Sequence, residues 1–222
     1  MSDVQTIAVV GGTGAEGSGL ALRLAAAGHA VTIGSRDPAR ARGKAAELNA
    51  LLADKMIGAS ANRDAAAAAD IVILTVPYSA QSATVEEIRD LLQGKILIDA
   101  TVPLMPPKVS RVQLPADGSA VAAIQKFLGS EVRVVSAFQN VSAHRLMHLG
   151  ERVDCDVLIC GDDVKACETV IALAAAIGLR GIYGGPIANS AAAEALTSLL
   201  IAINRRYKIK DSGIRITGMP HN

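Results

Sequence analysis

The sequence predicts an α/β fold built on a doubly wound parallel sheet, with a small α/β extension at its C-terminal end. Two observations lead to this prediction. Short apolar runs alternate with helical segments along the chain, as they do in βαβ units. Half of the 222 residues are hydrophobic, yet only 2% are aromatic, and a core of Ala, Val, Ile and Leu is typical of helices layered on a buried parallel sheet.

Six apolar runs in the first 140 residues are expected to be strands of this sheet. The clearest is Ile71–Val76, which is followed directly by Pro77, a residue that cannot donate to the strand ladder. In chain order the expected strands are Thr6–Val10, Val31–Ile33, Ile57–Ser60, Ile71–Val76, Ile96–Asp99 and Val132–Ser136.

Helices are expected between these strands, and two of them carry clear end signals. Gly28 is a natural C′ glycine for the first helix, and Pro38 opens the second at a first-turn position that tolerates proline. Further helices are expected shortly after Asp64, over about Ala80–Leu92 and near Val121–Leu128.

Residues 100–118 are expected to form a long irregular loop, because they show no periodicity and contain Pro103, Pro106, Pro107 and Pro115. Loops of this length inside compact domains are usually functional. This one follows the carboxyl end of an expected strand, so it is a candidate part of a binding site.

The boundary between two domains is expected near residue 140. Residues 1–140 form the larger domain, and residues 141–222 form a smaller one. In the smaller domain, strands at Asp156–Cys160 and Ile182–Tyr183 are expected around a helix over about Val164–Ile177.

The last helix, over about Ala191–Arg205, is apolar on nearly every face. Such a helix should be buried all round, and in a small domain this burial calls for a second subunit. A homodimer is therefore predicted, with burial wholly inside one chain as the alternative.

The charge balance argues against nucleic-acid and membrane partners. Lys and Arg number 22 and Asp and Glu 21, so no global field attracts polyanions, and aromatic residues are too few for a base-stacking platform. The N-terminus has no signal-peptide pattern, and no apolar run reaches the roughly 18 residues that span a bilayer. A cytoplasmic protein is expected.

No metal site is expected. Cys155, Cys160 and Cys167 fit no zinc or redox spacing and should be small buried hydrophobes. His144 and His148 have the spacing of one helix face, but a pair without a third ligand is more often structural than metal-binding. His29 follows a helix end and is expected to be exposed.

A glycine-rich turn follows the first expected strand and opens the first helix. Its sequence is Gly12-Thr13-Gly14-Ala15-Glu16-Gly17, and this context makes the pattern informative. Gly12 permits the tight turn, Gly14 lets the backbone approach a pyrophosphate, and Gly17 allows close packing of helix on strand. Backbone N–H groups at the helix start then face the phosphates. The larger domain is therefore expected to be a Rossmann-type dinucleotide-binding domain.

The end of the second expected strand favours NADP over NAD. An NAD-binding domain commonly has an acidic residue there for the ribose hydroxyls, whereas this chain reads Ser35-Arg36-Asp37, with Arg40 one turn later. A guanidinium matches phosphate oxygens bidentately. Two cations at a helix start oppose its dipole, so a bound 2′-phosphate explains them better than a solvated surface does.

Seven short stretches resemble the F420-dependent NADP reductases. The glycine stretch is shared with many dinucleotide-binding proteins, but the stretches at Cys160–Asp163 and Leu196–Thr197 lie outside the nucleotide half and make the resemblance specific. The matching stretches are Gly11–Gly14, Gly19–Leu24, Gly34–Arg36, Leu74–Pro77, Val134–Ala137, Cys160–Asp163 and Leu196–Thr197.

The resemblance implies a role for each candidate site residue. NADP contacts would fall on Thr13, Gly14, Ala15, Glu16, Ser35, Arg36 and Arg40. Tyr78 and Leu104 would line the nicotinamide end. The deazaflavin coenzyme F420 would lie against the turn that contains Ser136, Ala137, Gln139, Asn140 and Val141, to which the smaller domain contributes. This chain has Gln139-Asn140-Val141-Ser142 where a member of the family has His-Thr-Ile-Pro.

The reaction that the resemblance implies is hydride transfer between nicotinamide C4 and deazaflavin C5. Such a step needs positioning and water exclusion rather than a side-chain nucleophile, which agrees with the lack of an acid–base constellation in the sequence. One alternative is an NADPH-dependent reductase of a flavin, an imine or a ferric chelate, whose nucleotide half would look the same. Another is a non-catalytic NADP(H) sensor, which would leave the matching stretches of the second half without a role.

Overall fold

A computed structural model describes residues 4–53 and 56–219 and contains eight strands within these ranges. The strands are β1 (Thr6–Val10), β2 (Ala30–Ser35), β3 (Gly58–Ala61), β4 (Ile71–Leu74), β5 (Ile96–Asp99), β6 (Arg133–Ser136), β7 (Asp156–Gly161) and β8 (Arg180–Tyr183). They form one sheet in the order β3-β2-β1-β4-β5-β6-β7-β8. Neighbours run parallel except β6 and β7, which pair antiparallel.

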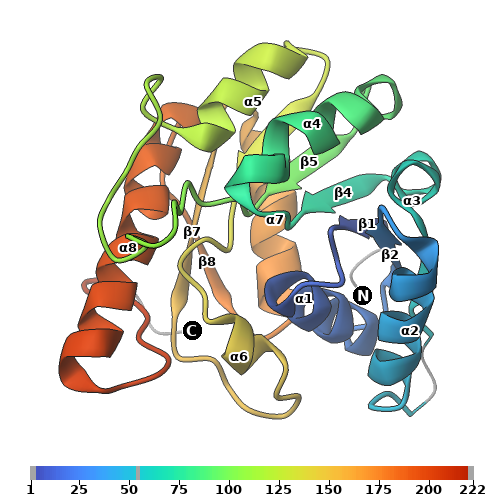
Figure 1. Ribbon diagram of the computed structural model, residues 1–222, viewed down its shortest axis with the longest axis horizontal. Coiled ribbons are helices and arrows are strands. Elements are labelled where there is room, and N and C mark those ends of the chain that lie inside the picture. The colour runs from blue at the N-terminus through green and yellow to red at the C-terminus, as the bar shows by residue number, and fades with distance from the viewer. Residues whose placement is uncertain (1–3, 54–55, 220–222) are drawn as a thin grey trace.

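Helices cover both faces of the sheet. They are α1 (Ala15–Ala26), α2 (Pro38–Asn49), α3 (Asn62–Ala68), α4 (Tyr78–Ile88), α5 (Ala120–Leu128), α6 (Ala143–Leu146), α7 (Val164–Ala176) and α8 (Ser190–Tyr207), with short 3₁₀ turns η1 (Arg89–Leu91) and η2 (Ile187–Asn189). Figure 1 shows α4 and α5 (green) on the opposite side of the strands from α1 and α2 (blue). The predicted doubly wound α/β sheet is therefore confirmed.

Two apolar cores lie on the two sides of the sheet. Side chains alternate along a strand, so Ile7 and Val9 join the core under α1, α2 and α7, while Ala8 and Val10 join the core under α3, α4 and α5. All four are at most 1% exposed. Burial on both faces explains why the strand sequences are continuously apolar rather than alternating.

The sheet continues across residue 140, because β7 pairs with β6 through Val135–Gly161 and Ser136–Cys160. Residues 141–219 thus extend the first sheet at one edge through β7 and β8. The division into two domains stays a prediction.

The element boundaries differ from expectation by a few residues. The strand expected to reach Val76 ends at Leu74, since the chain beyond it turns away to approach Gly11. The helix that follows begins at Tyr78 instead of Ala80, because Pro77 serves as its cap residue and needs no N–H partner there. The following loop, residues 100–118, contains no helix or strand, as expected.

One guanidinium holds α1 against the segment that carries α6. Arg23 is 7% exposed, and its side chain donates to five backbone carbonyls, those of Arg145, Leu146, His148, Glu151 and Ile177. A planar group with five N–H donors suits such a cluster of acceptors. This contact fixes the start of the C-terminal part of the chain against α1, the helix that follows the glycine turn.

Two expectations about burial are wrong. His29 is only 7% exposed because the chain doubles back there into β2, and its Nδ1 accepts from the N–H of Gln5. The alternative that α8 is buried wholly inside one chain is also wrong, since Leu199 is 53% exposed; burial by a second subunit stays a prediction. The three cysteines are free and buried, as expected.

By length and composition, one helical stretch of the described residues, Ile187–Tyr207, is apolar enough to cross a membrane, and 33% of its most apolar window is buried. The expectation that no apolar stretch is long enough to do so is therefore wrong. The helix nevertheless contains the buried carboxylate of Glu194, which accepts from the backbone N–H groups of Ala120 and Val121 at the start of α5. Such a contact anchors α8 to the folded protein.

Candidate functional site

A cavity of about 1280 Å³ opens at the carboxyl ends of β1 and β4. These strands are neighbours in the centre of the sheet, and the chain leaves them toward opposite edges. A doubly wound sheet binds its ligands at this switch point. The volume exceeds the 300–1,000 Å³ or so of a typical ligand pocket, so there is room for more than one small molecule.

The glycine turn has the close contacts that the motif predicts. A Cβ on Gly12 would lie 2.7 Å from the carbonyl oxygen of Val9, and one on Gly17 would collide with Thr75 Oγ1 and lie 2.7 Å from Gly12 Cα. The left-handed residue of the tight turn is Gly11, with φ of +75°, rather than Gly12. Sequence reasoning assigned Gly11 no role, although the double glycine was visible.

Gly14 differs from the other glycines of the turn because the protein itself leaves space beside it. A Cβ there would meet only the carbonyl oxygen of Gly11, at 3.7 Å, and the backbone angles of −77° and 168° suit any residue. Gly14 also lines the cavity. It is therefore a cradle that a side chain would fill and a ligand phosphate can occupy.

The first turn of α1 presents backbone N–H groups to the same space. Gly14 caps this helix without a side-chain hydrogen bond, and first-turn N–H groups have no partner inside a helix. Thr13, Ala15 and Glu16 line the cavity. This end of α1 can therefore receive an anion.

Glu16 brings a carboxyl group to the same end of the cavity. The residue is partly exposed, but its Oε1 is buried and has no hydrogen-bond partner among the described residues. Burial raises the pKa of this carboxyl to about 8. Glu16 is thus protonated at neutral pH, and a neutral carboxyl can donate a hydrogen bond to a phosphate oxygen.

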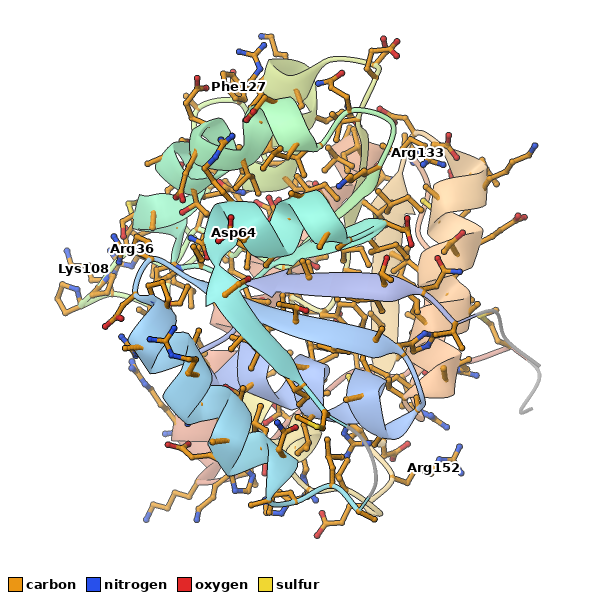
Figure 2. All side chains as sticks on the ribbon, turned by 90° about the vertical axis from the view of Figure 1, so that its right-hand side faces the viewer. Arg36, Asp64, Lys108, Phe127, Arg133 and Arg152 are labelled. Atoms are coloured by element: carbon orange, nitrogen blue, oxygen red, sulfur yellow. The ribbon has the colours of Figure 1, made fainter. Side chains whose placement is uncertain are left out.

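Ser35, Arg36 and Arg40 lie together at the rim of the cavity. Asp37, between them, is used as the cap of α2, because its Oδ1 accepts from the N–H groups of Ala39 (2.9 Å) and Arg40 (3.3 Å). One carboxylate oxygen of Asp37 is therefore committed to the start of α2. Neither Arg36 nor Arg40 forms an ion pair within the described chain. Figure 2 shows Arg36 at the edge of the molecule.

Asn62 was not identified from the sequence as a site residue. It opens α3, lines the cavity next to Gly34, and is 2% exposed with an Oδ1 that has no partner among the described residues. No motif marks this position, because it depends on how close β3 brings α3 to the end of β2.

The far end of the cavity is bounded by Tyr78, Leu104 and the irregular loop. Thr101, at the start of this loop, is 2% exposed, and its Oγ1 has no partner within residues 4–53 and 56–219. Tyr78 and Leu104 thus line the cavity, and their contact with a nicotinamide stays a prediction. Thr101 was not singled out from the sequence.

The turn after β6 contributes Gln139 and Val141 to the cavity. The Gln139 Nε2 donates to the carbonyl of Asp99 (2.8 Å) and to Ser136 Oγ (2.9 Å), which fixes the orientation of the amide. Its Oε1 is buried without a partner among the described residues and is free to accept from a ligand. Thr197 of α8, which also lines the cavity, donates to the backbone carbonyl of Gln139 at 2.7 Å.

Ser136, Ala137 and Asn140 do not line the cavity. Ser136 and Ala137 are fully buried, and Ser136 acts by holding the amide of Gln139. Asn140 joins the turn to β7, since its Nδ2 donates to the carbonyl of Asp156 (2.6 Å) and its Oδ1 accepts from the N–H of Leu158 (3.3 Å). These residues position the turn, and their contact with a ligand stays a prediction.

A second hollow of about 470 Å³ lies between α4, α5 and the loop. Its lining includes the carboxyl groups of Glu86 and Asp117 and no lysine or arginine. It therefore suits an anionic cofactor less well than the larger cavity. Within the described part of the chain, no three His, Cys, Asp or Glu side chains could hold a metal.

Comparison with known proteins places the chain among NADP-dependent oxidoreductases. A family profile described as NADP oxidoreductase, coenzyme F420-dependent, matches residues 6–103. The F420-dependent NADP reductase of Methanothermobacter thermautotrophicus is 43% identical over 98% of this chain and 97% of its own length. The F420-dependent NADP reductase of Methanocaldococcus jannaschii is 42% identical over 96% of this chain and 98% of its own length.

A solved structure of a putative F420-dependent NADP reductase from an Arthrobacter species superposes with a TM-score of 0.81. The two chains are 27% identical, and the match covers 96% of this chain and 99% of the other. Identity above 40% along almost the whole length of both archaeal proteins is sufficient to assign the family. This chain belongs to the family of F420-dependent NADP reductases.

Proposed function

We propose that this protein catalyses hydride transfer between NADP(H) and the deazaflavin coenzyme F420. The observation that carries the proposal is the single cavity that runs from the cations Arg36 and Arg40 to the unpartnered oxygen of Gln139. One end suits a phosphorylated ribose, and the other end presents a polar acceptor among apolar walls. Such a cavity can hold two cofactors end to end.

The residues at the end of the cavity near Arg36 fit the phosphates and ribose of NADP. The uncovered side of Gly14 leaves room for a pyrophosphate, and the first turn of α1 offers N–H donors. Arg36 and Arg40 would hold the 2′-phosphate, with Ser35 Oγ as a neutral neighbour. The unpartnered Oδ1 of Asn62 would accept from the adenosine ribose.

The residues at the other end fit a flat ring with polar edges. Gln139 Oε1 would accept from an N–H or O–H of a ring, and Thr101 Oγ1 lies in the same cavity as a second polar contact. Tyr78, Leu104 and Val141 would cover the faces of the rings and exclude water. The bound nicotinamide and deazaflavin supply the two reacting carbons, so the protein contributes positioning.

The test is an assay of the purified protein with NADPH and coenzyme F420. Direct loss of the deazaflavin absorbance, unchanged by a chelator, is the expected result. Parallel assays with a flavin, an imine and a ferric chelate test the alternative reductases. Reduction of one of these while the deazaflavin stays oxidised would overturn the proposal, and NADPH binding without turnover of any acceptor would favour the sensor.

We further propose that the protein is a homodimer joined through α8. Ala192, Leu196, Leu199 and Ile203 follow the alternating spacing of four and three residues that packs one helix against another, and none of them is fully buried. Leu199→Arg should give a monomer by light scattering at micromolar protein. A monomer mass for the wild-type protein would contradict the proposal.

A further inference from the structure

The two segments that border one end of the cavity are strongly basic, although the chain as a whole is almost neutral. Residues 100–116 and 195–210 contain no Asp or Glu. Their six cations are Lys108, Arg111, Arg205, Arg206, Lys208 and Lys210. We propose that Arg205, Lys108 and Arg111 form a subsite for the phosphate and carboxylate groups on the tail of the acceptor coenzyme. The subsite rests on the proposed function.

One hydrogen bond places the two segments next to each other. Arg205 Nη1 donates to Ser110 Oγ at 3.0 Å, so the last turns of α8 touch the irregular loop between Lys108 and Arg111. Figure 1 shows the loop (green) passing beside α8 (orange to red). The neighbour of Ser110, Val109, lines the large cavity. Lys108, Arg111 and Arg205 therefore flank a segment that lines the cavity, although none of the three lines it.

The position of Arg205 along α8 determines how far the subsite lies from the ring-binding end of the cavity. Thr197, Ile201 and Arg205 are four residues apart and share one face of the helix. Thr197 lines the cavity and binds the backbone of Gln139. With a rise of 1.5 Å per residue, Arg205 lies about 12 Å further along α8. A ribityl chain that leaves a ring at Gln139 can deliver its phosphodiester toward this position.

These cations are not neutralised by the protein. No ion pair involves any of the six within the described residues. The nearby acid, Asp211, is already engaged by Ser142, His144 and Arg145. Cations near the C-terminus of a helix favour its dipole, which accounts for Arg205 and Arg206. It does not account for Lys108 and Arg111, which belong to a loop.

The chemistry of the acceptor matches this surface. Coenzyme F420 carries a phosphodiester and glutamates on its ribityl chain, whereas the parent deazaflavin nucleoside has the same ring and ribityl chain and no anionic tail. The subsite should therefore strengthen binding of the full coenzyme and leave binding of the nucleoside unchanged. Exposed charge pairs each contribute little, so three of them give an expected combined effect of roughly 3- to 150-fold.

The experiment measures the dissociation constants of both deazaflavins by fluorescence titration in the presence of NADP. The triple variant Lys108→Ala, Arg111→Ala, Arg205→Ala should weaken coenzyme F420 binding at least several-fold and leave nucleoside binding within about twofold. Added salt should reduce the preference of the wild-type protein for the full coenzyme. Equal binding of both compounds by the wild-type protein, or equal losses for both in the triple variant, would overturn the subsite.

Two variants serve as controls. Arg152→Ala removes one exposed cation on the other side of the molecule from Lys108 (Figure 2) and should change neither constant. Ser110→Ala removes the hydrogen bond but no charge, so an effect as large as that of the triple variant would assign the role to loop geometry and overturn the proposal. The binding readout also separates the two proposals: selective binding without hydride transfer retains the subsite and rejects the proposed function.

Discussion

The side-chain amide of Gln139 donates to the backbone carbonyl of Asp99 at 2.8 Å, which ties the turn after β6 to the end of β5. Asp99 is itself fully buried, and its carboxylate accepts from Gln81 Nε2 (2.6 Å) and from the N–H of Thr101 (2.9 Å). The cavity oxygen of Gln139 is therefore oriented by the sheet rather than by a mobile loop. A polar group held in this way is preorganised for a ligand.

Gln139→Ala should weaken binding of the deazaflavin and spare NADPH. Loss of one hydrogen bond costs about 0.5–1.5 kcal/mol of binding free energy, which raises the dissociation constant roughly 2- to 10-fold. Ser136→Ala is the matched control, since it removes one partner of the amide and keeps Oε1, so its effect should be smaller. Equal weakening of both cofactors by Gln139→Ala would argue that the substitution disturbs the fold.

Arg36→Ala should remove the preference for NADPH over NADH. A hydrogen bond to a charged group contributes about 1.5–3 kcal/mol, so NADPH affinity should fall roughly 10- to 150-fold while NADH affinity changes little. Arg42→Ala, which removes an exposed arginine of the neighbouring helix α2 that does not line the cavity, is the control. Equal losses for the two cofactors in calorimetric titrations would contradict the assignment of Arg36 to the 2′-phosphate.

Gly14→Val should block NADPH binding without unfolding the protein. The protein offers no clash to a Cβ at this position, so the melting temperature should stay close to that of the wild type. Gly12→Ala is the contrasting variant, because its Cβ would lie 2.7 Å from the carbonyl of Val9 and should destabilise the turn. A Gly14→Val protein that still turns over NADPH at the normal rate would place the pyrophosphate elsewhere.

The sequence predicted best those features that depend on local spacing. The glycine turn, the cap signals at Gly28 and Pro38, and the strand cores of β1 and β5 were all placed correctly. These features depend on the residues next to them in the chain, so their physical causes can be seen in the sequence.

The sequence did not predict features that depend on the approach of distant segments. Asn62 reaches the cavity only because β3 pairs with β2, and Thr101 reaches it only because β5 pairs with β4. The burial of His29 depends on the N-terminal segment, where Gln5 meets it. The sequence could not predict that the face of α8 with Leu199 stays exposed in the single chain. A helix that is apolar all round gives no sign of which face the rest of the chain covers.

Glu16 should make NADPH binding pH-dependent. Burial raises its pKa from 4.5 to about 8, so the carboxyl is neutral beside the phosphates at pH 7 and becomes an anion as the pH rises through about 8. NADPH affinity should therefore fall above this pH in the wild type, and Glu16→Gln should bind with less dependence on pH in the same range. Parallel titration curves for both proteins from pH 6 to roughly 9.5 would contradict this assignment.

The raised pKa of Glu16 also predicts how the stability of the protein changes with pH. An ion-paired acid makes a protein more stable as the pH rises, whereas Glu16 should make it less stable. The unfolded carboxyl ionises near 4.5 and the folded one near 8, so the unfolded state holds fewer protons between these values. Stability contributed by this group therefore falls as the pH rises from 4.5 to about 8. Glu16→Gln should be as stable as the wild type near pH 4 and more stable near pH 8, as measured by urea unfolding.

Arg23→Lys should destabilise the protein although it keeps the charge. The guanidinium donates to five carbonyls, whereas an ammonium has three donors on a single atom and cannot reach the same set. Each buried carbonyl left without a donor costs about 1–3 kcal/mol. Because part of the set is retained or rehydrated, we expect a total loss of about 2–5 kcal/mol.

For a chain of this length, each kcal/mol lowers the melting temperature by about 2–4 °C, so Arg23→Lys should melt roughly 4–20 °C below the wild type. Arg152→Lys, an exposed neighbour of the same segment, should melt at the wild-type temperature. Because the bonds of Arg23 join α1 to residues 145–151, hydrogen exchange should increase first in that segment and at the C-terminal end of α1. Exchange that increases evenly over the whole sheet would instead show that Arg23 acts on the global fold and not on this junction.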